Sequence, residues 1–411
     1  MEYLLSVVIP SRNRQIYALQ SVQQIYAVTD ESVQIVVQDN SDDDSLAAML
    51  EKENFGPRVK YTYIATRIPG VDNYAGGIAA SDGEYVCCIG DDDGVLRGIV
   101  DVVKWAKENN IPAVKPGVQA SYFWPGTMPT FLEGCLNLEY TDASYYYANP
   151  QQELERFLKS GALDFPNAKL VKAYHGIVRK DMFQKIYDKT GRYCGGLSPD
   201  IYLSTSLSLD TDSLLCLNFP LTIFGACKQS TTGDSVNKVN VSKLELAPHF
   251  IGQPYTWSEK VPAYYCGMNI WADSAMHALD DMGAEDMKKL FYVEKLTCMC
   301  LLNHRAYKKE IMENFHRNNC DEQLLKKEMR QTYPGFMKKK IKETFRNIKP
   351  VAKIYRAIRD KRQAQVNEKV FTTAGIADIK TAEEIITATV QPAIDKFLDT
   401  MKNTKGGTDG K

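Results

Sequence analysis

The sequence lacks several features that would assign it to a class at once. Its 10 cysteines include no Cys-x-x-Cys pair and Met1 opens no secretory signal, so we expect reduced thiols in a cytoplasmic protein. The most apolar stretch, residues 214–227, is interrupted by Asn218 and Pro220 and falls short of the ~18 residues that span a bilayer. The net charge of -1 gives no reason to expect a nucleic-acid partner.

What remains is the composition of an ordinary globular protein, with 44% hydrophobic and 25% charged residues. At roughly 150 residues per domain, a chain of 411 residues predicts two or three domains. We expect an α/β domain over residues 1–235 and a helical extension packed on it over 236–335. Basic amphipathic helices and a flexible tail are expected over 336–411.

Strands and helices alternate over the first hundred residues. Apolar or β-branched runs at 4–9, 32–37, 59–64 and 85–89 predict strands, and helical spacing of apolar residues appears between them, as at 16–28. Such alternation favours a parallel, doubly wound sheet, whose ligands bind beyond the carboxyl ends of the strands. The glycine fingerprint of dinucleotide-binding folds is absent after the first strand, which argues against NAD.

Three of the predicted strand ends carry polar side chains. They are Ser11-Arg12, Asp39-Asn40 and the acidic triplet Asp91-Asp92-Asp93. Two unit charges ~4 Å apart repel by about 4 kcal/mol at an effective dielectric of 20, so crowded acids favour a bound cation. Mg²⁺ and Mn²⁺ prefer such oxygen ligands, commonly together with substrate phosphates. A solvated acidic turn is the alternative, but the three ends together describe a nucleotide-diphosphate site.

Four blocks of sequence, in this order and spacing, resemble the family 2 glycosyltransferases of GT-A fold. The blocks are SVVIPSRN at 6–13, VVQDNS at 36–41, GEYV at 83–86 and DDD at 91–93. The resemblance covers residues 1–100 firmly and extends more weakly to about residue 230. It implies a nucleotide-diphospho-sugar transferase with a Rossmann-like doubly wound sheet and a helical C-terminal region.

The resemblance also implies roles for individual residues. In the family, the residue matching Asp39 contacts the base or ribose, and the acidic motif binds the ribose and a Mn²⁺ or Mg²⁺ ion on the diphosphate. That motif is usually Asp-x-Asp-Asp, whereas Gly90 fills its first position here, so Asp92 becomes the main expected metal ligand. The expected nucleotide-sugar-binding residues are Pro10, Ser11, Arg12, Asp39, Asn73, Asp91 and Asp92, and the expected metal ligands are Asp92 and Asp93.

A second departure from the family concerns an Arg-Asn pair that usually stands ahead of the Gly-Glu-Tyr block. Tyr74-Ala75 replaces that pair here, which leaves Asp72 and Asn73 as its substitutes.

An inverting transfer also needs a carboxylate that takes the proton of the acceptor hydroxyl. The family places it at a helix start about a hundred residues after the metal motif, where this chain has Pro199-Asp200. We therefore expect Asp200 to be catalytic; the alternative is that it only caps the helix. His175 is expected to pack internally.

Residues 336–362 carry eleven Lys or Arg against Glu343 and Asp360, with an apolar stripe at three- and four-residue steps. This pattern is typical of a helix that lies on an anionic membrane surface, and Pro350 should kink it. The alternatives are a solvated helix that caps the domain and a helix that pairs with a partner chain in a homo-oligomer.

Together these observations predict an inverting, metal-dependent glycosyltransferase of surface polysaccharide synthesis. It would use a nucleotide-diphosphate sugar, most simply a UDP-sugar, and a hydroxyl of a glycan or lipid-linked acceptor. It would work in the cytoplasm, peripherally on the inner face of the membrane. Two alternatives are a nucleotidyltransferase on a similar fold, for which the first loop lacks phosphate-cradling glycines, and a non-catalytic sugar-binding protein.

Overall fold

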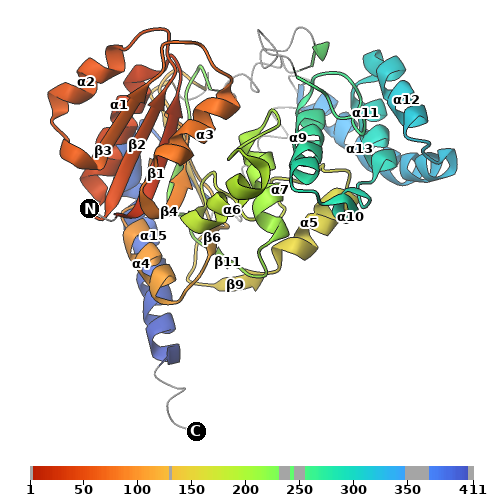
Figure 1. Cartoon of the computed structure of the whole chain (residues 1–411). Coiled ribbons are helices and arrows are strands. Elements are labelled where there is room, and N and C mark those ends of the chain that lie inside the picture. Colours follow the sequence, from red (N-terminus) through yellow and green to blue (C-terminus); the bar gives the residue numbers. More distant parts are fainter. Residues whose placement is uncertain (1–2, 129–131, 231–240, 245–254, 348–369, 406–411) are drawn as a thin grey trace. The chain divides into compact units, whose positions relative to one another are not determined.

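The computed structural model describes residues 3–128, 132–230, 241–244, 255–347 and 370–405 (Figure 1). The chain divides into two compact units, and neither is continuous in sequence. The first unit comprises Met1–Leu154, Lys169–Val239 and Phe371–Lys411, and the second comprises Glu155–Ala168 and Asn240–Val370. Every candidate site residue predicted from the sequence lies in the first unit.

The larger sheet of the first unit has the strand order β3-β2-β1-β4-β10-β6-β11-β9. The strands from β3 to β4 are parallel, as predicted, whereas β10 pairs antiparallel with both β4 and β6, so the sheet is mixed. The arrangement is that of the GT-A fold. The bounds are β1 Tyr3–Ser11, β2 Val33–Asp39, β3 Val59–Tyr63, β4 Gly83–Cys88, β6 Ala113–Pro116, β9 Tyr145–Ala148, β10 Ile177–Arg179 and β11 Leu214–Leu217.

Helices cover the sheet on both faces, which explains why β1 is a continuous apolar run rather than an alternating one. Leu5, Val7 and Ile9 share a core with α1 and α4, while Val8 faces α3, where Gly77 has no side chain that would collide with it. The helices are α1 Gln15–Val28, α2 Ser45–Glu53, η1 Gly56–Arg58, α3 Gly70–Ala80, α4 Ile99–Glu108, α6 Lys180–Thr190 and α7 Pro199–Leu209. Helix α5, Pro150–Lys159, begins in the first unit and ends in the second.

A second sheet of the first unit has the order β13-β8-β7-β12-β5. Its strands are β5 Gly94–Val95, β7 Ala120–Phe123, β8 Cys135–Glu139, β12 Thr222–Ala226 and β13 Val370–Ala374. The apolar stretch 214–227 thus forms two strands, β11 in one sheet and β12 in the other. Strand β5 begins directly after the acidic triplet and pairs with β12, so the triplet is connected to both sheets.

The C-terminal helix α15, Ile379–Lys405, belongs to the core of the first unit. It lies beside α4 (Figure 1), as the aromatic contacts of Phe397 show. The ring of Phe397 packs edge-on against Trp105, Tyr145 and Phe219, with centroids 5.2, 5.4 and 5.6 Å away. The apolar face of α15 thus closes the core of the α/β unit.

The second unit is built of helices. Its helices are α9 Gly267–Asp281, α10 Glu285–Lys288, α11 Val293–Asn303, η4 Arg305–Tyr307, α12 Lys308–Arg317 and α13 Glu322–Asn347. Cys298, Leu302, Phe315 and Leu325 form its buried centre. All ten cysteines of the chain are free thiols. No helix in the described ranges is both long enough and apolar enough to cross a membrane. Residues 348–362 of the predicted basic segment lie outside the described residues.

Candidate active site

The acidic triplet Asp91, Asp92 and Asp93 follows β4 at the carboxyl edge of the parallel strands, next to the end of β1. The three residues are 0%, 4% and 1% exposed, so the triplet is buried and is not a solvated turn. Buried carboxylates are costly unless they are hydrogen-bonded or paired with cations. Their partners therefore decide what each carboxylate is free to do.

Asp93 is surrounded by four donors. Its Oδ2 atom accepts hydrogen bonds from the Gly90 N–H at 2.5 Å and the Tyr174 hydroxyl at 2.8 Å, and it lies 3.0 Å from His175 Nε2. Its Oδ1 atom accepts the Gly225 N–H at 2.6 Å. Burial alone would raise the pKa of Asp93, but His175 and these donors hold it below the ordinary value. The Asp93 carboxylate thus ties the turn to the segment that precedes β10 and to β12.

Asp91 and Asp92 share a cation instead. Asp91 Oδ2 accepts the Ser11 hydroxyl at 2.7 Å, and Asp92 Oδ2 accepts the Cys227 N–H at 2.8 Å. Each turns its Oδ1 atom toward Arg14, whose Nη2 lies 2.7 Å from Asp91 Oδ1 and whose Nη1 lies 3.4 Å from Asp92 Oδ1. Arg14 precedes α1 in the turn after β1, so one arginine links the ends of two parallel strands.

One arginine does not neutralise this cluster. Burial raises the pKa of Asp91 to about 7, although the charge of Arg14 opposes the shift. Burial, and then the charge of Asp93, raises the pKa of Asp92 as well. A further cation near Asp91 and Asp92 would therefore be stabilised by the negative charge that Arg14 leaves uncompensated.

The residues fit a divalent ion only in part. Among the described residues, no group of three or more His, Cys, Asp or Glu side chains is arranged to hold a metal by itself. Both oxygens of Asp93 are already engaged by protein groups, whereas Asp91 and Asp92 each have one oxygen that faces only Arg14. Because Mg²⁺ is commonly held by one or two carboxylates together with substrate phosphates, this pair fits such an ion when a diphosphate completes its ligands.

Two glycines explain the shape of the motif. A Cβ atom on Gly90 would lie 3.0 Å from Asp93 Oδ2 and 3.2 Å from both Asp92 Oδ1 and the Tyr174 hydroxyl, which leaves little room for the aspartate usual in the resembling family. A Cβ atom on Gly225 would lie 1.6 Å from the Asp92 carbonyl oxygen. Strand β12 therefore passes directly against the acidic turn, as only a glycine permits.

The expected binding residues after β1 lie at the same edge. Pro10 is half-buried near the end of β1, where it pairs with Gln38 of β2. The Ser11 hydroxyl donates to Asp91. The guanidinium of Arg12 points elsewhere: it donates to the carbonyl and side-chain oxygens of Asn40, both at 3.1 Å, and to Asp42 at 2.7 Å. Arg12 thus braces the turn after β2.

Asp39 is the last residue of β2, where it pairs with Ser11, and Asn73 lies in the first turn of α3. Asp39 is 0% exposed; its carboxylate accepts the N–H and hydroxyl of Ser41 at 2.9 and 2.6 Å and the Tyr61 hydroxyl at 3.0 Å. The Asn73 amide donates to main-chain carbonyls at the ends of β1 and β2, at 3.1 and 3.2 Å. The Asn73 Oδ1 atom is buried without a hydrogen-bond partner among the described residues, and Asp72 is exposed.

Asp200 lies in the first turn of α7. Ser198 holds the N-cap position and Pro199 is the first helical residue, so Asp200 lies inside the first turn and not at the N-cap. Burial raises the pKa of Asp200 to about 6, while the charges of His175 and Lys172 oppose the shift and that of Asp93 adds to it. The charge of Asp93 therefore acts on Asp200.

Sequence reasoning left three functional candidates without a role. Arg14 carried a signal, since it is a cation in the turn next to a predicted acidic cluster. Lys172 and Tyr174 carried none, because they precede a three-residue strand with no motif of their own. Burial lowers the pKa of Lys172 to about 8, with Lys115 adding to the shift and Asp200 opposing it. Lys172 is thus an amine whose charge acts on the candidate base.

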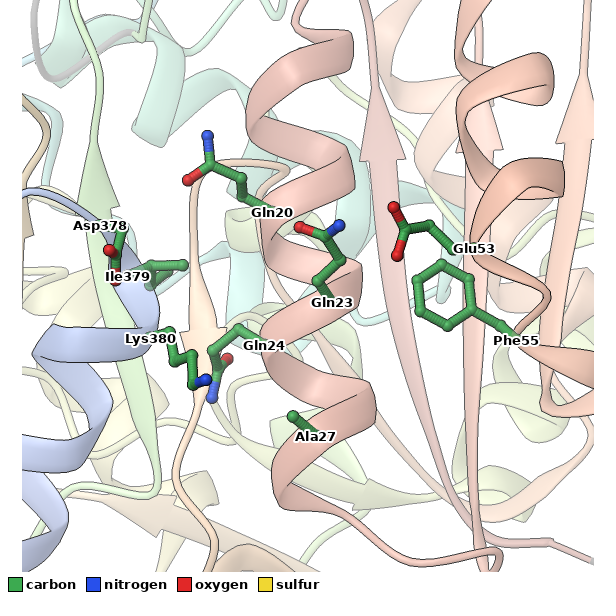
Figure 2. Close-up of a pocket in the computed structure, with 9 residues that line it drawn as sticks. All are labelled: Gln20, Gln23, Gln24, Ala27, Glu53, Phe55, Asp378, Ile379 and Lys380. Atoms are coloured by element: carbon green, nitrogen blue, oxygen red, sulfur yellow. The ribbon is translucent and has the colours of Figure 1, made fainter.

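A separate hollow of about 510 Å³ lies on α1, between the end of α2 and the start of α15 (Figure 2). Three glutamine side chains of α1 line it together with residues of the other two segments: Gln20, Gln23, Gln24, Ala27, Glu53, Phe55, Asp378, Ile379 and Lys380. None of the site residues predicted from the sequence lines this hollow.

Residues 6–128 match the model of glycosyl transferase family 2. Among solved structures, S. aureus TarS 1-349 in complex with UDP-GlcNAc is 14% identical, with a TM-score of 0.43 over 78% of this chain and 93% of that chain. The complex of TarS 1-349 with UDP is 15% identical, with a TM-score of 0.38 over 55% of this chain and 61% of that chain, less than two thirds of its length. A comparison with curated proteins gives no match.

The family match includes β1, the turn with Arg14, Asp39 and the whole acidic triplet, which are the residues that meet at the carboxyl edge of the sheet. The mixed sheet and its helices have the corresponding fold. Residues 6–128 of this chain therefore match the domain of glycosyl transferase family 2, and this match supports a glycosyltransferase.

Proposed function

We propose that the protein transfers a sugar, with inversion, from a nucleotide-diphosphate donor to a hydroxyl group of a glycan or lipid-linked acceptor. The donor is a UDP-sugar, the metal is Mn²⁺ or Mg²⁺, and the product belongs to a surface polysaccharide. The observation that carries the proposal is the buried pair Asp91 and Asp92 at the carboxyl edge of the sheet, in the same electrostatic neighbourhood as Asp200. A diphosphate site and a carboxylate base are what such a transfer needs.

On the donor side, Ser11, Asp91 and Asp92 are held in register by hydrogen bonds between strand ends. Ligands of open α/β sheets bind at this edge. A divalent ion held by Asp92 and Asp91 would neutralise charge on the leaving diphosphate. Asp93 was expected as a ligand too, but its four donors support a bracing role, so we assign the metal to Asp92 with Asp91.

On the acceptor side, Asp200 would accept the proton of the attacking hydroxyl. The new bond forms between the acceptor oxygen and the anomeric carbon of the sugar, while the bond from that carbon to the diphosphate oxygen breaks. A single displacement of this kind inverts the anomeric centre. The pKa of about 6 suits Asp200 to the role, because the carboxylate is ionised near neutral pH yet basic enough to take a proton.

We also propose that residues 336–362 associate with an anionic membrane surface. In the described part, Lys338, Lys339 and Lys340 are exposed at the end of α13, and Ile341 is 50% exposed beside them. Exposed cations next to an exposed apolar side chain are what an interfacial helix presents to lipid headgroups.

A donor screen tests the transferase proposal. The full chain is titrated with nucleotide sugars, including the UDP-GlcNAc named for the similar TarS structure, with and without Mn²⁺, and binding is followed by calorimetry. We expect one nucleotide sugar to bind only with the metal, and slow release of its nucleotide diphosphate in the presence of acceptor. UMP serves as the control that lacks the second phosphate. Absence of binding for every nucleotide sugar would reject the proposal, and binding without turnover on any acceptor would favour a non-catalytic sugar-binding protein.

A further inference from the structure

Arg14 occupies the place at which a divalent cation would meet the acidic motif. Its two terminal nitrogens lie 2.7 and 3.4 Å from the Oδ1 atoms of Asp91 and Asp92. The other oxygen of each carboxylate is already committed to Ser11 or to the Cys227 N–H. The two atoms that face Arg14 are therefore the ones that these carboxylates can offer to a metal.

Exposure shows which partner is able to move. The Arg14 side chain is 22% exposed, whereas those of Asp91 and Asp92 are 0% and 5% exposed. Arg14 is also attached to a turn, just before the first residue of α1, while the acids are fixed by hydrogen bonds to two other strands. Displacing the arginine thus disturbs less structure than displacing either carboxylate.

We propose that Arg14 is the resident counter-cation of Asp91 and Asp92 in the donor-free protein, and that it moves to the diphosphate when the metal and the nucleotide bind. This inference rests on the proposed function, because it requires a nucleoside diphosphate and a divalent ion at this site. A guanidinium forms paired hydrogen bonds with phosphate oxygens as readily as with carboxylates, so Arg14 keeps an anionic partner after it moves.

One consequence is cooperativity between metal and nucleotide. A metal that binds alone must displace Arg14 and leave the guanidinium without an anionic partner. A metal that arrives with the diphosphate supplies that partner. Each ligand should therefore tighten the other by the same factor, as linkage between two binding equilibria requires.

The test measures Mn²⁺ binding by the full chain with electron paramagnetic resonance, first alone and then with UDP. Arg14→Met keeps the aliphatic stem and removes the charge. Arg179→Met is the matched control, because Arg179 pairs with Asp181 at 2.8 Å on α6, away from the triplet. In the wild type and the control, we expect UDP to tighten Mn²⁺ at least tenfold. In Arg14→Met, Mn²⁺ alone should bind at least tenfold more tightly than to the wild type, and UDP should add much less.

Equal affinity of the wild type and Arg14→Met for Mn²⁺ alone would overturn the inference. If Arg14→Met does not fold, Arg14→Lys is the variant that decides. It keeps the positive charge but lacks the paired N–H donors of the guanidinium, so UDP affinity at saturating Mn²⁺ should fall several-fold. An unchanged UDP affinity would overturn the inference. Failure of every form to bind UDP would reject the proposed function itself. Tighter binding of Mn²⁺ alone to Arg14→Met would still support the counter-cation assignment in that case.

Discussion

His175 Nε2 lies 3.0 Å from Asp93 Oδ2, and both side chains are almost completely buried, at 3% and 1% exposure. The other ring nitrogen, Nδ1, lies 2.9 Å from the Thr222 hydroxyl, and the ring stacks on Phe224 with centroids 3.5 Å apart. His175 also has a φ angle of 57°, in the left-handed region. It is therefore a positioning residue that clamps the acidic turn onto β12, as its expected internal packing suggested.

The first prediction concerns this clamp. His175→Asn tolerates the left-handed backbone but loses the ring and its reach to Asp93. We expect it to lower the free energy of unfolding by about 1–3 kcal/mol, the cost of leaving a buried polar group without its partner. Metal-dependent UDP affinity should fall with it, because the turn carrying Asp92 is less firmly held. Chemical denaturation and calorimetry measure the two effects.

The control for this variant is His277→Asn, since His277 lies 3.6 Å from a buried aspartate, Asp273, but in the second unit. It should leave UDP affinity unchanged. Wild-type stability together with wild-type UDP affinity in His175→Asn would show that the clamp has no positioning role.

The second prediction separates the roles of neighbouring acids. Asp92→Asn should weaken Mn²⁺-dependent UDP binding at least tenfold with little loss of stability. Its carboxylate accepts one backbone donor, the Cys227 N–H, and its ion-pair partner Arg14 keeps the shorter pair with Asp91. Asp93→Asn should act mainly on stability, and its UDP affinity should fall through the same loosening of the turn as in His175→Asn. The Asp93 carboxylate faces four polar groups, and the asparagine amide would replace one of its acceptor oxygens by a donor. The free energy of unfolding should therefore fall by about 1–3 kcal/mol or more.

Calorimetry and denaturation on both variants, with the surface variant Asp181→Asn as a control, decide between the assignments. Asp92→Asn with undiminished metal-dependent binding would contradict the metal assignment. A stable Asp93→Asn that no longer binds Mn²⁺ with UDP would return Asp93 to the ligand set that the sequence predicted.

The strands and the converging strand ends were predictable because their signals are local. The apolar run of β1, the turn after it and the acids after β4 each stand within a few residues, and parallel pairing then brings them to one edge. The different fates of the three acids were not predictable. They depend on Gly225 and Cys227, about 130 residues later in the chain, which donate to Asp93 and Asp92.

The position of α15 was hidden for a similar reason. Its apolar spacing predicts a helix with one buried face, but periodicity does not say what covers that face. Here Phe397 meets Trp105, nearly 300 residues earlier, so only tertiary structure shows that the C-terminal helix completes the α/β unit. In the same way, the ion pair of Arg14 with Asp91 depends on how two distant turns meet.

The third prediction concerns Asp200 as the base. Asp200→Asn should bind donor normally and lose transfer by about 10²- to 10⁴-fold. Asp210→Asn, at the other end of α7 and exposed, is the matched control and should keep its activity. In the wild type, the base must be ionised, so the rate should fall as the pH drops through about 6, the raised pKa of Asp200.

Lys172 offers an independent check on that limb of the pH profile. Its positive charge stabilises the Asp200 carboxylate, so Lys172→Met should raise the pKa of Asp200 and move the acid limb to higher pH. An acid limb that stays in place in Lys172→Met, or transfer by Asp200→Asn at the wild-type rate, would exclude Asp200 as the titrating base.

The fourth prediction tests the C-terminal helix. Phe397 is 0% exposed among three aromatic rings, so Phe397→Ala should lower the free energy of unfolding of the first unit by about 3–5 kcal/mol. Phe371→Ala, at a residue that is 46% exposed, should cost far less. Thermal and chemical unfolding measure the difference. Equal losses for the two variants would mean that α15 does not belong to the core.

The fifth prediction concerns membrane association of residues 336–362, and the place of α15 determines how it is tested. Truncation before this segment would also remove Phe397 and destabilise the first unit, so charge substitution in place is the better experiment. Replacing Lys338, Lys339, Lys340 and Lys342 by Gln removes four cations, each worth about 1 kcal/mol near an anionic surface. Partitioning onto anionic vesicles should fall by as much as roughly 10³-fold at low salt.

The matched control replaces Lys326 and Lys327, which are exposed earlier on the same helix α13. It should leave partitioning of the full chain nearly unchanged, because those cations lie before the predicted interfacial segment. Raising the salt should weaken wild-type binding without abolishing it, since the ~10 Å screening length at 0.1 M reduces the charge contribution while the apolar contribution remains. Equal partitioning of the wild type and the four-lysine variant at low salt would reject the membrane role and favour a helix that pairs with another chain, which sedimentation analysis of the same samples would detect.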